Sequence, residues 1–124
     1  MNVSIDNNSI TIALSEINAF NCRLFIEEYK ILYENITGAG KRVLIIKECD
    51  NFAIRDNKVM LVFANTLFSK FKKQHTEHIS NIEIRLNNKS LISLCKKIFV
   101  LCPPKHEYKF ILGKDVLTTE IMKE

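Results

Sequence analysis

The strongest constraint on the fold is an uninterrupted apolar run, residues 43–46, that stands between Arg42 and Lys47. Four consecutive apolar side chains are typical of a central strand in a parallel sheet, because such a strand is covered on both of its faces. A polar turn over residues 48–51 and a short apolar approach over 52–54 separate this run from a long apolar helix, which we predict over residues 56–74. The segment 41–71 therefore predicts a strand, a turn and a helix on which the rest of the chain packs.

The hydrophobic pattern of the remaining chain predicts alternating strands and helices. The expected elements are a β-hairpin over residues 3–14, helices over 21–36 and 90–100, strands over 82–86 and 108–112, and a short terminal helix over 115–123. Strands that are separated by helices run parallel through right-handed crossovers, whereas the hairpin adds an antiparallel strand at or near an edge. We therefore predict one α/β domain, residues 1–124, with a mixed, mostly parallel β-sheet and helices packed against it in the order β-β-α-β-α-β-α-β.

The composition indicates a domain that folds without a metal or a disulfide. The chain has 124 residues, of which 47% are apolar and 26% charged, and this length is sufficient to bury a core. The formal net charge of +4 is small and the acidic residues are interspersed among the basic ones, which does not favour a nucleic-acid partner. No secretory leader and no apolar run of membrane-spanning length is visible. We therefore expect a cytoplasmic protein without membrane association, whose four cysteines are thiols.

The helix predicted over residues 56–74 has an apolar stripe that is wider than one packed face requires. The main face consists of Met60, Phe63, Ala64, Leu67 and Phe71, and it is widened by Leu61, Val62 and Phe68. Two interpretations are open. Either the fold covers two sides of this helix, or one side is left for a partner.

The segment 15–21 (SEINAFN) leads from a predicted strand into a helix, and the segment 38–46 (GAGKRVLII) leads out of that helix into the central strand. The first is similar to the start of the first helix in STAS domains, the fold of anti-anti-sigma factors and of the cytosolic tails of sulfate transporters, and the second is similar to the helix exit and central strand of that family. The strand, helix and closing strand predicted between residues 82 and 110 follow the order of that family. The resemblance implies a STAS-like fold.

The chain departs from the family in the turn before the second helix. Regulated bacterial members carry an Asp-Ser-Ser-Gly-like loop there, and a partner kinase phosphorylates its serine. In register, this chain has Arg55, Asp56, Asn57 and Lys58, and none of these side chains has a hydroxyl for a serine kinase. Asp56 is either a fixed negative charge at the helix N-terminus or an ordinary N-cap.

The residues that could carry catalysis or bind a metal do not form a recognisable constellation. His75 and His78 are three residues apart, but a zinc site needs three or four ligands and only Glu77 is close, so we interpret the pair as a solvated helix end. Cys102 and His106 would need orientation by a third group to act as a nucleophilic pair. We therefore predict no enzymatic activity, no cofactor and no metal.

Our hypothesis is a non-enzymatic protein–protein interaction or assembly module of STAS-like fold that lacks the phosphoserine switch. The partner is another protein or a second copy of the chain, which would form a homo-oligomer. The predicted partner-binding residues are Asp50, Asn51, Arg55, Asp56, Asn57, Lys58, Leu61 and Phe68. The alternative is a weak nucleic-acid-binding protein that uses its lysine clusters. Residues 70–75 form the main cluster, and residues 41–42 or 96–97 could join it if the fold brings them together.

Overall fold

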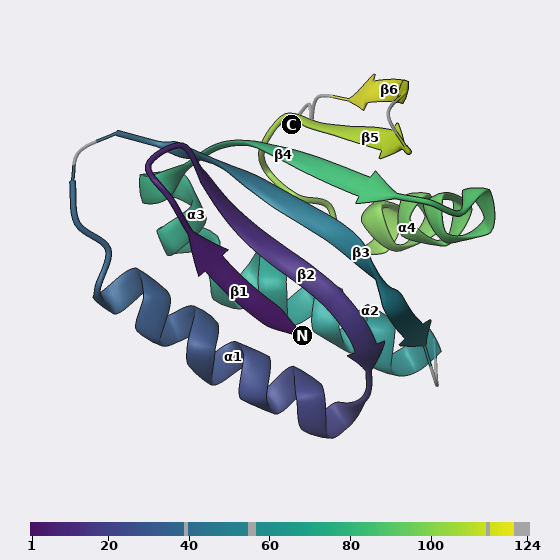
Figure 1. Cartoon of the computed structure of the whole chain (residues 1–124), viewed down its shortest axis with the longest axis horizontal. Coiled ribbons are helices and arrows are strands. Elements are labelled where there is room, and N and C mark those ends of the chain that lie inside the picture. The colour runs from purple at the N-terminus through teal and green to yellow at the C-terminus, as the bar shows by residue number, and fades with distance from the viewer. Residues whose placement is uncertain (39, 55–56, 114, 121–124) are drawn as a thin grey trace.

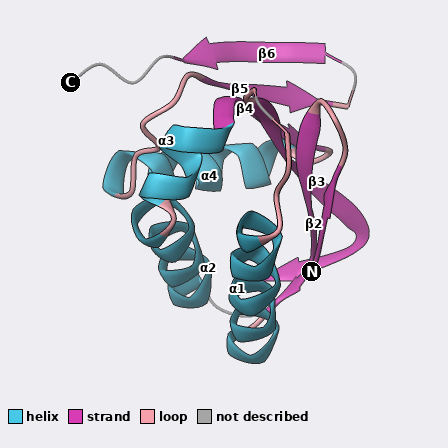
Figure 2. Cartoon of the chain, turned by 90° about the vertical axis from the view of Figure 1, so that its left-hand side faces the viewer, coloured by secondary structure: helices cyan, strands magenta, loops and turns pink. Residues whose placement is uncertain are grey.

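The structure is a six-stranded β-sheet with its helices on one face (Figure 1, Figure 2). The computed structural model describes residues 1–38, 40–54, 57–113 and 115–120. The strands are β1 (Asn2–Ile5), β2 (Ser9–Ile17), β3 (Arg42–Ile54), β4 (Ile79–Leu86), β5 (Tyr108–Leu112) and β6 (Asp115–Glu120). The helices are α1 (Ala19–Glu34), α2 (Asn57–Asn65), the π-helical turn η1 (Thr66–Lys70), α3 (Lys72–His78) and α4 (Lys89–Leu101).

The strands lie side by side in the order of the sequence, from β1 to β6. The pairs β2–β3, β3–β4 and β4–β5 are parallel, and each is connected through helices. The outer pairs β1–β2 and β5–β6 are antiparallel hairpins. This arrangement confirms the predicted mixed, mostly parallel sheet with helices packed against it.

All helices cover the same face of the sheet, as Figure 2 shows. Each crossover connects a strand to its next neighbour, always in the same direction along the sheet. Because the crossovers share one handedness, their helices all lie on the same face of the sheet. The run at residues 43–46 is central, as predicted, but the prediction that helices cover both of its faces is wrong. Leu44 and Ile46 are buried beneath the helices, whereas Val43 and Ile45 on the other face are half-buried.

The core lies between the helices and the covered face of the sheet. Alternate residues of the strands point into it, which the period of two in a strand requires. The fully buried strand residues include Ile10, Ile12, Leu44, Ile82 and Phe110. From the helical side, Phe25 and Tyr29 of α1 stack against each other, and the ring of Phe63 in α2 packs edge-on against Phe25.

Helix α1 begins at Ala19, two residues before the predicted start, because Asn18 is the N-cap. The backbone N–H of Asn21 donates a hydrogen bond of 2.8 Å to Oδ1 of Asn18, which satisfies a free donor of the first turn. The chain leaves the helix through Gly38 and Gly40, whose φ angles of 90° and 106° favour glycine. The C-cap is Asn35, so the helix ends at Glu34, before its predicted end at residue 36.

The predicted single helix over residues 56–74 is wrong, because the structure divides it into α2, η1 and α3. The π-helical turn over Thr66–Lys70 widens the helix by one residue per turn. Leu67, Phe68 and Phe71 are all buried in the core, on one side of the helical segment. The wide apolar stripe is therefore largely explained by burial within the chain.

The predicted polar turn over residues 48–51 is also wrong, because β3 continues through this region to Ile54. Leu14 of β2 pairs with Glu48, and Glu16 pairs with Ala53, so two steps along β2 correspond to five steps along β3. The additional residues of β3 form a bulge or irregularity in its pairing with β2. The polar segment thus interrupts the register without ending the strand.

The predicted terminal helix is wrong as well, because Asp115–Glu120 forms strand β6 beside β5. Val116, Thr118 and Thr119 are β-branched, and such side chains favour the extended backbone. Gly113, with φ of 60°, allows the chain to turn between β5 and β6. Residues 121–124 of the predicted helix lie outside the described residues.

Candidate functional site

The predicted partner-binding residues around the start of α2 belong to β3 and to α2 itself. Residues 50 and 51 belong to the irregular part of β3. Residues 55 and 56 lie outside the described part of the chain. Asn57 and Lys58 are the exposed first residues of α2. Of this group, Lys58 is the residue that the fold brings to a groove.

The two apolar members of the predicted site are not equivalent in the structure. Phe68 is 8% exposed, and its ring packs edge-on against Phe99 of α4 with 5.4 Å between the ring centroids. Leu61 is half-buried and packs against the core. The exposed apolar side chain of α2 is Val62, at 63%. The apolar surface of this helix is therefore centred on Val62 and not on Phe68.

A groove of about 340 Å³ runs between α1 and α2, which lie next to each other in Figure 2. We call it the α1–α2 groove. Its lining is almost entirely apolar and consists of Ala19, Cys22, Arg23, Ile26, Lys58, Val59, Val62, Phe63 and Thr66. Short side chains cause the gap, since Ala19 and Cys22 of α1 face Val59 and Val62 of α2.

The polar part of the groove is cationic. Arg23 from α1 and Lys58 from α2 are both exposed side chains, and no acidic residue belongs to the described lining. The Cys22 thiol at the floor has a raised pKa because it is buried, so it stays protonated and poorly nucleophilic at neutral pH. The groove can therefore hold apolar side chains and attract negative charge at its border. The sequence pattern did not reveal the contribution of α1, because its apolar residues indicated a single buried face.

A second cluster joins α1 to α3 through a buried hydrogen-bonded chain. The Tyr29 hydroxyl lies 2.7 Å from the Tyr33 hydroxyl and 2.7 Å from Nε2 of His75. The interpretation of His75 as a solvated helix end is wrong, because this side chain is only 3% exposed. Its burial, and secondarily His106, lower its pKa to about 4, so the imidazole is neutral at physiological pH.

His106 lies beside this hydrogen-bonded cluster. The ring centroids of His75 and His106 are 6.5 Å apart. Burial and the charge of Lys41 lower the pKa of His106, while hydrogen bonds to the backbone of His75 and Ile79 act in the opposite direction. The cavity next to these rings has a volume of only about 10 Å³, which holds no more than a water-sized molecule. The arrangement therefore has the character of a satisfied polar core.

Three lysines from distant parts of the chain gather around His106. Lys72 and Lys105 line the small cavity beside it, and Lys41 is close enough to influence its pKa. The cluster of residues 96–97 is elsewhere, on α4, where the Lys96 ammonium lies 5.8 Å from the centroid of the Phe110 ring. The fold thus joins part of the predicted lysine cluster to Lys41 and leaves the α4 lysines apart.

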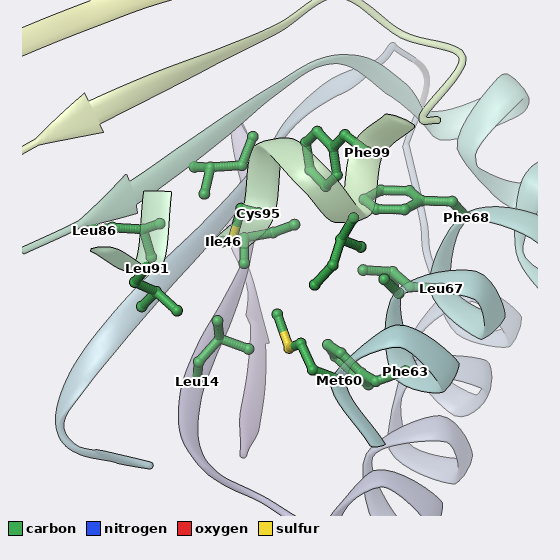
Figure 3. Close-up of a pocket in the computed structure, with 13 residues that line it drawn as sticks. Leu14, Ile46, Met60, Phe63, Leu67, Phe68, Leu86, Leu91, Cys95 and Phe99 are labelled. Carbon is green, nitrogen blue, oxygen red and sulfur yellow. The ribbon is translucent and has the colours of Figure 1, made fainter. Parts of the chain in front are cut away.

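The interior also contains a narrow apolar cavity of about 30 Å³ between the sheet, α2 with η1, and α4 (Figure 3). Met60, Phe63 and Leu67 point into it from one side, and Leu91 and Cys95 from the other. Burial raises the pKa of the Cys95 thiol to about 12, so this sulfur behaves as a small apolar group. The cavity is a packing defect of the core, too small for an organic ligand.

Within the described part of the chain, no three His, Cys, Asp or Glu side chains are placed to hold a metal ion together. No helix among the described residues has the length and apolar character required to cross a membrane. Comparisons with protein families, with curated proteins and with solved structures found no match to this chain. The resemblance to STAS domains therefore stays a prediction.

Proposed function

We propose that this chain is a non-enzymatic protein-interaction module that binds an apolar segment of another protein in the α1–α2 groove. The observation that carries the proposal is the exposure of Val62 within a groove lined by two helices. An apolar groove between two helices can accept the apolar side chains of an amphipathic segment, as in helix-in-groove recognition. The volume of about 340 Å³ is sufficient for one or two such side chains.

The charge at the groove indicates the chemistry of the partner. Arg23 and Lys58 stand at its border, so acidic residues beside the apolar anchors of the partner would be favoured. Exposed charges of this kind affect the rate and selectivity of binding more than the final affinity. We therefore expect an amphipathic segment with one or two large apolar anchors and acidic flanks.

The location of the groove supports this proposal. Lys58 belongs to the predicted partner-binding residues, and it lies at the start of α2, next to the position of the regulatory loop in STAS domains. A binding site there would use constant surface complementarity, because the chain has no hydroxyl at residues 55–58 that a kinase could modify. The STAS-like character of the module is part of the proposal.

The chain offers a matched pair of valines for the test. Val62 is 63% exposed in the groove, and Val100 is 81% exposed on α4. A photo-crosslinking residue at position 62 should capture a partner that the same residue at position 100 does not capture. The binding segment of that partner should then lose at least tenfold in affinity for the Val62→Asp variant, which corresponds to about 1.4 kcal/mol, and bind Val100→Asp normally in calorimetry. Equal affinity for both variants would refute the groove as the binding site.

A second candidate function, nucleic-acid binding, is favoured by the arrangement of Lys41, Lys72 and Lys105 around His106. Basic side chains on one surface bind phosphates with an affinity that falls steeply with salt. For a single-stranded oligonucleotide, the Lys41→Glu and Lys105→Glu changes should each reduce the slope of log affinity against log salt by about 0.7. Lys97→Glu on α4 is the control. Absence of salt-dependent binding by the unmodified chain would exclude this function.

A further inference from the structure

Strand β1 is an outer strand of the sheet, and only one of its sides pairs with another strand. In an antiparallel pair, residues whose N–H and C=O groups bond across the pair alternate with residues whose groups point away from it. The N–H of Asp6 donates to the carbonyl oxygen of Ser9 at 2.9 Å, which fixes this alternation next to the turn. Ile5 and Val3 therefore direct their N–H and C=O groups to the free side of β1.

These four backbone groups are available to another molecule. Within the described part of the chain, no hydrogen bond connects them to the backbone of another element. Strand β1 contains no proline, no lysine and no register shift in its pairing with β2, which are features that commonly shield an edge strand. Two donors and two acceptors at the repeat of a strand are complementary to another extended backbone.

A groove of about 530 Å³ lies between β1 and α1, and Figure 1 shows α1 on the outer side of β1. We call it the edge groove. Val3 and Ile5 line it because they pair with Ile12 and Ile10, whose side chains are buried beneath the helices. The apolar lining from α1 and the segment after it consists of Ile31, Leu32 and Ile36.

The charges of the edge groove favour a cationic group on its occupant. The Glu28 carboxylate belongs to the lining and has no ion pair of 4.0 Å or less in the described part of the chain. Asp6 adds a second carboxylate. Arg42 also lines the groove, but its Nε and Nη2 atoms already donate to the carbonyl oxygens of Asp6 and Thr37, at 2.7 and 3.3 Å. Glu28 is thus the charge that a partner can complement.

We infer that the free edge of β1 binds an extended segment of another protein, which adds a strand to the sheet and places alternate apolar side chains in the edge groove. In the antiparallel orientation, the residues opposite Val3 and Ile5 each exchange two hydrogen bonds with them, and their side chains point to the same face. A lysine or arginine further along that face reaches Glu28. The edge groove shares no residue with the described lining of the α1–α2 groove, so this site is separate from the proposed function.

Backbone and charge distinguish this occupant from others. A helix bonds its own N–H and C=O groups internally, so it would leave the edge of β1 unpaired. A second copy of this chain would offer its own β1, Asn2–Ile5, which has no basic residue for Glu28. A nucleic acid or an anionic membrane would be repelled by Glu28 and Asp6.

The probe for the test is a display library of random peptides of about twelve residues, selected on the full chain. The enriched peptides should have apolar residues at alternating positions and a lysine or arginine on the same face. In calorimetry, Ile5→Pro should weaken their binding at least tenfold, which corresponds to about 1.4 kcal/mol, because proline lacks the free N–H. The outer side of an edge strand tolerates proline, and circular dichroism checks that the variant is folded. Ile5→Val keeps the N–H and should bind nearly normally.

Methylation of the peptide's backbone nitrogens separates strand pairing from contact in the groove, and it needs no variant of the chain. A peptide methylated at its two apolar anchors keeps their side chains but should bind at least tenfold more weakly. Glu28→Gln should weaken binding of the peptide with the basic residue, and it should not affect a peptide that has threonine there. Val62→Asp in the α1–α2 groove should leave binding unchanged, so failure of the proposed function would be distinguishable.

Three results would overturn the inference. The first is a selection that enriches no peptide of alternating pattern, and the second is undiminished binding of the methylated peptide. The third is a dimer of the unmodified chain that Ile5→Pro dissociates in analytical ultracentrifugation, because a second copy would then be the occupant of the edge.

Discussion

Acidification should destabilise the fold through His75, and the size of this effect follows from its environment. The imidazole is buried between α1 and α3, with its Nε2 atom 2.7 Å from the Tyr29 hydroxyl. Protonation there would place a positive charge in the core, near His106, without a carboxylate among the described contacts. Burial therefore lowers the pKa of His75 from its usual value of 6.5 to about 4.

The sign of the effect follows from the difference between the folded and unfolded states. Between pH 6.5 and pH 4 the unfolded chain binds a proton at His75 and the folded chain does not, so the free energy of unfolding decreases as the pH falls through this window. One pH unit corresponds to about 1.36 kcal/mol, and the whole window to about 3 kcal/mol. The lowered pKa of His106 acts in the same direction.

Urea unfolding followed by circular dichroism, at several pH values between 7 and 4.5, measures this dependence. A double variant, His75→Phe with Tyr29→Phe, removes both members of this hydrogen bond. It also removes the bond from Tyr29 to the Tyr33 hydroxyl, which lowers the stability without adding a group that titrates in this window. It should lose most of the pH dependence in this window. If the double variant keeps the slope of the unmodified chain, or if the His75 resonances in an NMR titration report a pKa near 6.5, the reasoning is refuted.

Three further experiments test the packing of the chain. Phe68→Ala should lower the free energy of unfolding by about 3 to 5 kcal/mol in urea unfolding, because its ring is buried against α4, whereas Leu61→Ala should have a clearly smaller effect. Asn18→Ala should lower the same quantity by about 1 kcal/mol, through loss of the N-cap hydrogen bond to α1. In a thiol-reactivity assay on the folded chain, Cys95 should react only on unfolding, and the half-buried Cys102 should react before it.

The architecture could be predicted from the sequence because each strand and helix has its own local pattern. The strand over Tyr108–Leu112 was predicted with the bounds that the structure has. Helix α1 was predicted from its apolar spacing, although both of its ends lie two residues earlier in the structure than the predicted ones, behind the cap at Asn18 and before Asn35. The central position of β3 followed from its apolar run. The bare face of the sheet could not be read from that run, because a half-buried Ile45 and a buried Leu44 are the same kind of residue in sequence.

The site was less predictable, because it depends on residues that meet only in the fold. Phe68 widened the predicted apolar stripe, and its burial depends on Phe99 of α4, which packs against its ring only in the fold. His75 and Tyr29 are separated by 46 positions, so their hydrogen bond leaves no trace in either local pattern. The α1–α2 groove arises where short side chains of two helices face each other. Its one sequence signal, Ala19 and Cys22 among larger residues, becomes informative only when the neighbouring helix is known.

The face of the sheet opposite the helices is open, so it is an alternative surface for a partner. A mostly parallel sheet is usually covered on both faces. Here the open face carries a row of cross-strand neighbours in which Thr11, Ile45, Glu83 and Lys109 follow one another from β2 to β5. Oε1 of Glu83 lies 2.9 Å from Nη2 of Arg85, and its Oε2 lies 3.9 Å from Nζ of Lys109. Such surface pairs contribute little stability, but they keep the face hydrated.

A partner that covered this face would have to remove water from three charged side chains around Glu83, which is unfavourable unless new partners replace it. The α1–α2 groove requires no such loss, because its lining is mostly apolar and its charges stand at the border. Glu83→Leu therefore provides a contrast. It should change the stability of the chain only slightly and leave binding of the groove's partner unaffected, as urea unfolding and calorimetry on this variant would measure. Loss of that binding would place the interaction surface on the sheet.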